Sequence, residues 1–416
     1  MWRLLPLVII GLQVLVYFTF INYLKTTRIY KPSHRWWALV PFVLFNVSFI
    51  VINLTWGRNF APPLWFKYAG VYPFYIWMAA TFFISLWVLI GKLIKLPFKI
   101  PVWIAKLIKP LRKKINDWKE HKTVRQVDLS RRKFVRYVTM GVSTYAFGGA
   151  AYGMIRHDAY RIEHKDIKIA NLPEELKGTT ITLICDIHAG QYMDENDMRE
   201  YAEIVNEMNS DIICIPGDFV NFDVRDIHPL AKAFRDMKAK YGVFGSLGNH
   251  DFFQDAEYVA KGIVNESPVT LLRNDAKKIT INGKDLYIIG VDDTRGAGAH
   301  MTAVINYYES VENNLKASDP NFNNAPKVLL CHKPYGFDAL AQKEIDLVLA
   351  GHTHGGQVVP IKLGNFNLSF AATVSKYIEG LYKIGKSNMY VSRGIGTVGL
   401  PIRINCPPEI TKIKLV

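Results

Sequence analysis

Long uncharged and mainly apolar runs dominate the first part of the chain. Three of them are 21, 22 and 24 residues long and cover residues 4–24, 36–57 and 68–91. A helix needs about 20 apolar residues to cross the hydrocarbon core of a bilayer. Three buried helices of a soluble domain are the alternative, but residues 1–91 contain no acidic residue. We therefore predict three transmembrane helices within residues 1–95.

A fourth uncharged run covers residues 137–155 and is 19 residues long. It is rich in Gly, Ser, Thr and Ala, so its hydrophobicity is marginal for a membrane helix. The stretch SRRKFVR at residues 130–136 precedes it and resembles a twin-arginine export signal, which also stands before a weakly apolar run. An ordinary basic flank of a membrane helix is an equally good interpretation. We predict a fourth transmembrane helix at residues 137–155.

The pattern changes near Lys165, where short apolar runs begin to alternate with polar, helix-like segments. The predicted strands are TTITLICD (179–186), DIICIPGD (211–218), YGVFGSLGNHD (241–251), DLYIIGVDD (285–293), KVLLCH (327–332) and IDLVLAGH (345–352). Strands that alternate with helices predict a layered α/β fold. Residues 165–416 are numerous enough for one sizeable core.

The net charge of +15 is unevenly spread along the chain. Residues 1–136 carry 22 Lys and Arg against 3 Asp and Glu, whereas the remainder carries 29 against 33. Because the basic excess lies beside apolar segments, it favours the membrane lipid bilayer as partner, and we expect no nucleic acid. Residues 96–136 are predicted to form a basic cytoplasmic loop, part of which lies in the membrane interface. Its prolines at positions 97, 101 and 110 argue against one long helix.

Residue types that bind metals follow five of the predicted strands. They are Asp186 and His188, Asp218, Asn249 and His250, His332, and His352 and His354. In α/β sheets, sites form just beyond the carboxyl ends of the strands, where loops converge. Each motif alone is commonplace, but five in this arrangement predict a metal site. Glycines in the loop GHTHGGQ (351–357) allow sharp turns and close backbone approach.

In this order, the motifs DIH, GD, GNHD, H and GHTH resemble those of the calcineurin-like metallophosphoesterase superfamily. Residues 165–416 are similar to its bacterial membrane-associated branch, down to GHTHGGQ and the ending YVSRGIGTVGLPIRINCPPEI. The resemblance implies an α/β fold, a four-layer αββα metallophosphoesterase sandwich, preceded here by an all-α transmembrane region. The N-terminal runs lie outside the shared motifs.

The resemblance also implies two divalent metal ions and assigns their ligands. One ion would take Asp186, His188, Asp218 and His354, and the other would take Asp218, Asn249, His332 and His352, so that Asp218 bridges both. His250 would instead face the substrate, stabilise the transition state and protonate the leaving oxygen. Nitrogen and oxygen ligands without thiolate suit Mn²⁺, Fe or Zn²⁺. We interpret the four cysteines as buried apolar residues and not as ligands.

One departure from the superfamily concerns the residues after the bridging aspartate. Its protein Ser/Thr phosphatases carry a further Asp-Arg pair there, and this chain has Asn221 and Phe222 at those positions. The departure argues against a protein phosphatase. Asp251 or Asp223 is our hypothesis for the residue that supports His250.

These features predict a membrane-anchored, binuclear metal-dependent phosphoesterase that hydrolyses phosphodiester or pyrophosphate bonds. Its substrate would be a phosphorylated small molecule or a lipid. A UDP-diacylglucosamine hydrolase at the cytoplasmic face, which some relatives in the branch resemble, is one alternative. A metal-binding membrane receptor or scaffold without turnover is another, disfavoured because all eight motif residues are present. Arg393 and Arg403 are candidates either for phosphate contacts or for structural ion pairs.

The basic residues between the apolar runs also predict an orientation. The loops after the first and third runs are strongly basic, whereas the loop after the second carries only Arg58 and Lys67. The positive-inside rule places the two basic loops in the cytoplasm. A fourth crossing at residues 137–155 then puts the catalytic domain outside. We expect a multi-pass protein of the cell inner membrane with an extracytoplasmic catalytic domain.

Overall fold

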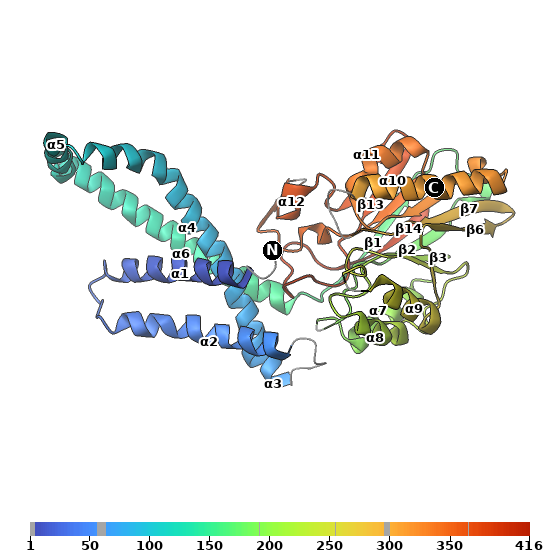
Figure 1. Ribbon diagram of the computed structural model, residues 1–416, viewed down its shortest axis with the longest axis horizontal. Coiled ribbons are helices and arrows are strands. Elements are labelled where there is room, and N and C mark those ends of the chain that lie inside the picture. The colour runs from blue at the N-terminus through green and yellow to red at the C-terminus, as the bar shows by residue number, and fades with distance from the viewer. Residues whose placement is uncertain (1–4, 56–63, 191, 254, 295–299, 365) are drawn as a thin grey trace. The chain divides into compact units, whose positions relative to one another are not determined.

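The chain divides into two compact units, Met1–Met154 and Ile155–Val416. The computed structural model describes residues 5–55, 64–190, 192–253, 255–294, 300–364 and 366–416. In the described residues, the first unit is helical and the second combines helices with sheets (Figure 1).

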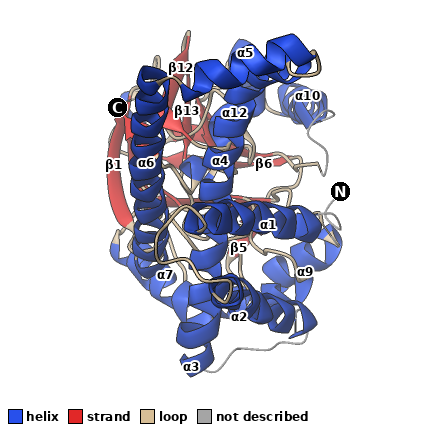
Figure 2. Ribbon diagram, turned by 90° about the vertical axis from the view of Figure 1, so that its left-hand side faces the viewer, coloured by secondary structure: helices blue, strands red, loops and turns tan. Residues whose placement is uncertain are grey.

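The first unit is built of helices, shown in blue in Figure 2. They are α1 (Leu5–Leu24), α2 (His34–Thr55), the short α3 (Leu64–Phe66), a π-helical turn (Lys67–Val71), α4 (Tyr72–Ala105), α5 (Lys109–Glu120) and α6 (Lys122–Ile155). Helices α1, α2 and α4 contain most of the three apolar runs. Among the described residues, Lys67–Ala105 is the one helix long and apolar enough to cross a membrane, and Val8–Leu24 forms a shorter apolar helix. Since α6 does not meet this measure, a crossing at residues 137–155 stays a prediction.

The segment predicted as a basic loop is mostly helical. The prolines at positions 97 and 101 lie inside α4, and residues 96–136 are divided among α4, α5 and α6 instead of forming one long helix. Each proline removes one backbone N–H donor from the helix. Because the two prolines are four residues apart, both missing hydrogen bonds lie on the same face of α4. The backbone hydrogen bonds on the other faces of the helix are kept. The third proline lies in the first turn of α5, where an N–H has no helical partner anyway.

Two six-stranded sheets form the second unit. The first sheet has the order β1 (Arg161–Ile167), β14 (Glu409–Leu415), β2 (Thr180–Leu183), β3 (Ile212–Pro216), β4 (Val243–Ser246) and β5 (Val269–Leu271). The second has the order β12 (Gly380–Ile384), β13 (Ser387–Val391), β9 (Leu347–Ala350), β8 (Lys327–Leu330), β7 (Lys284–Gly290) and β6 (Asp275–Ile281). A separate hairpin pairs β10 (Ile361–Leu363) with β11 (Phe366–Leu368).

The two sheets pack face to face between helices, which confirms the predicted four-layer sandwich. Residues of both sheets, among them Leu183, Phe244, Ile288 and Leu349, form the central core. A second core lies between the first sheet and helices α7 (Glu195–Glu207), α8 (Ile227–Ala233) and α9 (Ala256–Glu266). A third lies between the second sheet and α10 (His300–Ser318) and α11 (Phe337–Leu340), on the opposite side in Figure 1.

Parallel strand pairs position the loops that carry the predicted site. β2, β3 and β4 are parallel neighbours in the first sheet, and β8 and β9 are parallel neighbours in the second. Their carboxyl ends therefore lie at a common edge within each sheet. Because the sheets are stacked, the loops of both sheets can meet there.

Candidate metal centre

Every predicted ligand lies in a loop that directly follows one of these five strands. Asp186 and His188 follow β2, Asp218 follows β3, Asn249 and His250 follow β4, His332 follows β8, and His352 and His354 follow β9. The strand boundaries agree with the predicted apolar runs. Three of the five loops come from one sheet and two from the other, so the site requires both sheets.

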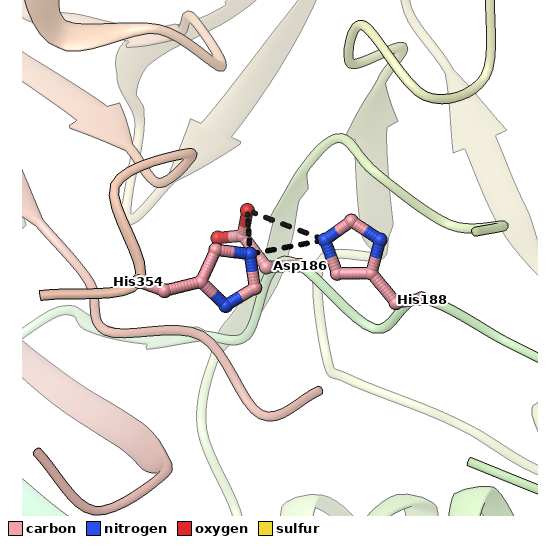
Figure 3. A group of neighbouring side chains, drawn as sticks. All are labelled: Asp186, His188 and His354. Carbon is pink, nitrogen blue, oxygen red and sulfur yellow. Dashed lines mark hydrogen bonds and ion pairs between the residues drawn. The ribbon is translucent and has the colours of Figure 1, made fainter. Parts of the chain in front are cut away.

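The first group of side chains is Asp186, His188 and His354, shown in Figure 3. Nε2 of His188 lies 3.0 Å from Nε2 of His354, and the latter lies 3.4 Å from Oδ1 of Asp186. All three side chains are buried. Two ring nitrogens and a carboxylate oxygen thus converge on one point, an arrangement that could hold a metal ion.

The second group is Asp218, His332 and His352, again with ligand atoms within 4.8 Å of one another. Nε2 of His332 lies 3.1 Å from Oδ2 of Asp218, and Nε2 of His188 lies 3.6 Å from the same oxygen. Asp218 therefore lies between the two groups, at the position that the resemblance implies for a bridging carboxylate. Asn249 adds a buried Oδ1 that has no hydrogen-bond partner among the described residues.

The backbone is unusual at the ligands themselves. Asp186, His188, Asp218, His352 and His354 have φ between 50° and 71°, a left-handed region that non-glycine residues rarely adopt. Such conformations cluster at functional sites and persist where the surroundings fix them. Close packing explains two of the glycines: a Cβ at Gly248 would lie 2.3 Å from Oδ1 of Asp218, and one at Gly351 would lie 2.2 Å from Oδ2 of Asp186.

Burial and charge set the protonation of the imidazoles. Burial lowers the pKa of His188 and His354 well below the usual range and lowers that of His352 to about 3. Burial also acts against a charge on His332, but the neighbouring Asp218 raises its pKa to about 10. Burial would raise the pKa of Asp218, whereas the imidazoles, His332 foremost, hold it well below its usual value. Burial thus favours the neutral form of His188, His352 and His354, whereas the neighbouring Asp218 favours the protonated form of His332.

Backbone carbonyls orient two of the rings. Nδ1 of His332 lies 2.8 Å from the carbonyl oxygen of Pro216, and Nδ1 of His250 lies 2.7 Å from that of Asn221. A carbonyl oxygen only accepts, so both rings donate through Nδ1–H. The Nε2 atom of each ring then remains to bind a metal ion or to contact the substrate. His250 also belongs to a group with His188 and Asp218, and its ring centre lies 4.6 Å from that of His188.

Comparison with known proteins decides the family of this site. Residues 179–356 match the model of the calcineurin-like phosphoesterase family, and this segment contains all eight predicted site residues. The chain carries a calcineurin-like phosphoesterase domain. The match confirms the resemblance and the prediction of a hydrolase domain.

Several relatives share this phosphoesterase domain. A "Transmembrane protein with metallophosphoesterase domain" from Danio rerio is 29% identical over 64% of this chain and 60% of its own length. An "Uncharacterized metallophosphoesterase" from Helicobacter pylori is 27% identical over 62% of this chain and 64% of its length. "Phosphodiesterase YaeI" from Escherichia coli is 24% identical over 69% of this chain and its entire length. The chain thus spans somewhat less than two thirds of the first two relatives.

The support of His250 in the phosphoesterase domain differs from our hypothesis. Asp251 accepts hydrogen bonds from the backbone N–H groups of Phe219 and Gly248, at 2.9 and 2.8 Å, and so ties the loops after β3 and β4 together. Asp223 pairs instead with Arg225. Neither carboxylate supports His250, because a backbone carbonyl already accepts its Nδ1–H. Every residue has a backbone carbonyl, so the sequence contains no signal that could predict this hydrogen bond.

Aromatic rings flank the same histidine. The ring centre of Phe253 lies 4.3 Å from that of His250, and the ring centre of Phe222 lies 5.6 Å from it. Phe222 occupies the position at which the protein phosphatases of the superfamily have an arginine. An apolar ring therefore replaces a cation beside the proposed acid.

The two candidate arginines have structural surroundings. Arg393 forms ion pairs with Glu163 and Glu409 at 3.0 and 2.8 Å. Arg403 is buried and donates to the carbonyl oxygens of Arg393 and Gly394 at 2.9 and 3.1 Å. These contacts favour the structural interpretation over direct phosphate binding.

Cys185 has a role that the sequence did not reveal. Its thiol donates to Oδ2 of Asp186 at 2.8 Å, and burial raises its pKa well above the usual value, so it stays protonated. The sequence indicated only that Cys185 is a buried apolar residue and not a ligand. The turn after β2, where Asp186 has a positive φ, brings the two side chains together.

The side chains present fit divalent metal ions. Buried imidazole nitrogens, two carboxylates and an unpartnered amide oxygen at Asn249 form a donor set without thiolate. Such donors suit Mn, Fe or Zn. The family also implies divalent metals, which agrees with this part of our prediction.

Proposed function

We propose that the chain is a membrane-attached phosphoesterase with two divalent metal ions that hydrolyses phosphodiester or pyrophosphate bonds. The observation that carries the proposal is the position of Asp218, whose Oδ2 lies within 3.6 Å of ring nitrogens from both ligand groups. The name of the relative "Phosphodiesterase YaeI" supports the diester class. The Asn221–Phe222 departure disfavours phosphoprotein substrates.

In this proposal, the two ligand groups hold the ions as the resemblance assigns them, with Asn249 completing the second. When bound, the ions would activate a water molecule and polarise the phosphoryl oxygens. The chain itself supplies the fixed geometry, because the surrounding structure holds the ligand residues in left-handed conformations that they would otherwise rarely adopt. The hydrogen bonds from Cys185 to Asp186 and from the His250 backbone N–H to Oδ1 of Asp218 (2.8 Å) hold both carboxylates in place.

His250 acts as the acid in this scheme. Its Nδ1–H is held by the carbonyl of Asn221, so Nε2 is the nitrogen that can present a proton to the leaving oxygen. The rings of Phe222 and Phe253 exclude water beside it, which strengthens its electrostatic interaction with the substrate.

Hydrolysis of a chromogenic bis-aryl phosphate tests the reaction. The purified full-length protein is stripped of metal and then loaded with Mn²⁺, Zn²⁺ or Fe²⁺ in separate samples. We expect hydrolysis that depends on the added metal, followed by turnover of components in a lipid and metabolite extract. Two bound ions without hydrolysis of any substrate would favour the alternative of a metal-binding receptor or scaffold.

We further propose that the helical unit anchors the protein in the cell inner membrane and that the phosphoesterase domain lies outside the cytoplasm. Supporting observations are the apolar helix Lys67–Ala105 and the basic residues flanking the first and third runs. The name of the Danio rerio relative points in the same direction.

Protease treatment of cells with a permeabilised outer barrier tests this orientation. We expect digestion of the phosphoesterase domain while the inner membrane is intact. Protection until the inner membrane is lysed would place the domain in the cytoplasm. That result would favour the UDP-linked lipid alternative, because such lipids are available there.

A further inference from the structure

The β10–β11 hairpin follows the metal-binding loop 352–357 closely and has one wholly apolar face. In its register, Ile361 is opposite Leu368, and Leu363 is opposite Phe366. Directly opposed residues and residues two apart lie on the same face of a β-ribbon. These four side chains therefore share one face, and all four are exposed, Leu363 to 71%.

The other face of the hairpin is polar and contacts the protein. Lys362 and Asn367 are opposite each other in the register. Asn367 donates through Nδ2 to the carbonyl oxygen of Gly355 at 3.1 Å, and Lys362 forms an ion pair with Glu379. This orientation is the reverse of the usual one, in which a sheet turns its apolar face to the core and its polar face to water.

Two further exposed apolar residues follow the hairpin in the chain. Phe370, 82% exposed, precedes α12 (Ala371–Val374), which is labelled in Figure 1, and Val374 ends it. The apolar hairpin face comprises Ile361, Leu363, Phe366, Leu368, Phe370 and Val374. Over residues 361–374, Lys362 is the only charged residue, and it belongs to the opposite face. A concentration of exposed large apolar residues of this kind is expected at a site of interaction.

We propose that the apolar hairpin face inserts into the lipid bilayer and presents lipid-linked phosphodiesters to the metal centre. This inference rests on the membrane attachment proposed above. Residues 156–160 are the whole connection between α6 and β1, and five residues span at most roughly 18 Å. If α6 crosses the membrane as predicted, this short connection keeps the start of β1 near the bilayer surface. An uncharged apolar face suits the acyl boundary of a bilayer, where a charged side chain is costly.

The hairpin couples such insertion to the site. Gly355, which accepts the hydrogen bond from Asn367, directly follows His354 in the chain. A Cβ at Gly356 would lie 2.4 Å from Oγ of Ser369, so the segment after β11 packs tightly on the same loop. Insertion of the hairpin thus places the ligand loop beside the headgroups. The substrate class is then a membrane lipid with a phosphodiester or pyrophosphate in its headgroup.

A fluorescent probe on the apolar hairpin face tests the contact without any need for activity. All four native cysteines are buried, so NBD labels an introduced cysteine selectively. The variants are Phe370→Cys and Leu363→Cys, with Val264→Cys as the control, because Val264 is an exposed apolar residue on α9. Each full-length protein is reconstituted into phosphatidylcholine vesicles that contain doxyl-labelled lipid.

We expect loss of most of the NBD emission at positions 370 and 363 and no quenching by the lipid label at position 264. Equal quenching at all three positions, or none at any, would overturn the proposal. A disulfide that joins two molecules of the Phe370→Cys variant, together with no quenching by lipid, would also overturn it and assign the face to a second copy of the chain.

Two matched substrates test the catalytic consequence. The double variant Phe366→Ser/Phe370→Ser is compared with Ile162→Ser/Val264→Ser, which alters two exposed apolar residues elsewhere in the domain. We expect the first variant to lose at least about tenfold in hydrolysis of phosphatidyl-p-nitrophenol in vesicles, because the lipid is no longer positioned. Hydrolysis of soluble bis-p-nitrophenyl phosphate should not change.

The comparison of the vesicle-bound with the soluble substrate distinguishes the role of the hairpin from the proposed phosphoesterase activity. Equal losses on both substrates, or none on either, would overturn the role of the hairpin in presenting lipid. If the unaltered protein hydrolyses neither substrate, the proposed function fails, and the quenching result still decides whether the apolar hairpin face contacts the bilayer.

Discussion

The two units of the chain expose opposite kinds of side chain. The helical unit exposes large apolar residues such as Phe18, Trp37 and Leu44, and it buries polar ones such as Gln13 and Ser85. The phosphoesterase unit does the reverse, with apolar cores between its layers. A protein surface takes the polarity of its surroundings, so the comparison supports the proposed attachment of the first unit to a membrane. The apolar hairpin face resembles the helical unit, because it belongs to the second unit but exposes large apolar side chains.

The hydrogen bonding of buried polar side chains also differs between the two units. In the helical unit the buried Gln13 bonds to neighbouring side chains: Nδ2 of Asn46 donates to Oε1 of Gln13 at 2.7 Å, and Nε1 of Trp77 donates to the same oxygen at 3.3 Å. In the phosphoesterase unit, Oδ1 of Asn249 is buried without a hydrogen-bond partner among the described residues. The polar side chains of the helical unit thus satisfy one another, whereas the phosphoesterase unit has a buried oxygen atom that can bind a metal ion.

The largest effect should come from Asp218→Asn in the phosphoesterase unit. This change removes the carboxylate between the two ligand groups, so we expect both metal ions to be lost and activity to fall at least about 10³-fold. The fold should survive, because an amide oxygen can still accept the N–H of His250. Metal analysis and hydrolysis of the bis-aryl phosphate provide the measurement. Asp236→Asn, at an exposed aspartate, is the control, and two ions retained by the Asp218 variant would contradict the assignment.

The next effect separates chemistry from metal binding. His250→Ala should keep both ions but lower activity by about 10²–10⁴-fold, the usual cost of removing a positioned acid. The loss should be greatest for substrates with poor leaving groups, which most need a proton. His228→Ala, at an exposed histidine bonded to Glu266, serves as the control. Equal losses on good and poor leaving groups would argue against the acid role.

These strand-end residues were the most predictable part of the molecule. Apolar runs predict buried strands, and parallel strands bring their carboxyl ends together, so the pattern of the sequence alone could place Asp186 and Asp218 near each other. The carbonyl that holds His250 could not be predicted, because every residue has one. The exposed face of the hairpin could not be predicted either. The alternation at residues 361–363 indicates two faces but does not say which one meets the protein.

Thermal unfolding tests the reversed polarity of the hairpin directly. Leu286 is fully buried between the sheets, so Leu286→Ala should cost about 2–5 kcal/mol through lost burial and a cavity. Phe366→Ser lies on the apolar hairpin face and should change the free energy of unfolding by less than about 0.5 kcal/mol. The melting temperatures of the two full-length variants, measured in detergent, provide the comparison. A loss at Phe366 as large as that at Leu286 would mean that this ring is part of a core.

The smallest effect concerns the polar contact between α1 and α2. Gln13→Leu leaves the amide of Asn46 without its 2.7 Å partner, and Asn46→Leu leaves that of Gln13. Hydrogen bonds between membrane helices contribute about 0.6 kcal/mol on average and at most about 2 kcal/mol, because each amide finds other partners when the helices separate. We therefore expect a double-mutant cycle of these two changes to give a coupling energy in this range, measured by unfolding of the reconstituted protein in a denaturing detergent. Thr19→Val is the control, because the Thr19 hydroxyl donates to the Leu15 carbonyl within the same helix, α1. Metal content and hydrolysis should be unchanged in every variant of the cycle. A coupling energy near zero would show that the buried amides do not hold these helices together, and the contrast between the units would then rest on their apolar surfaces alone.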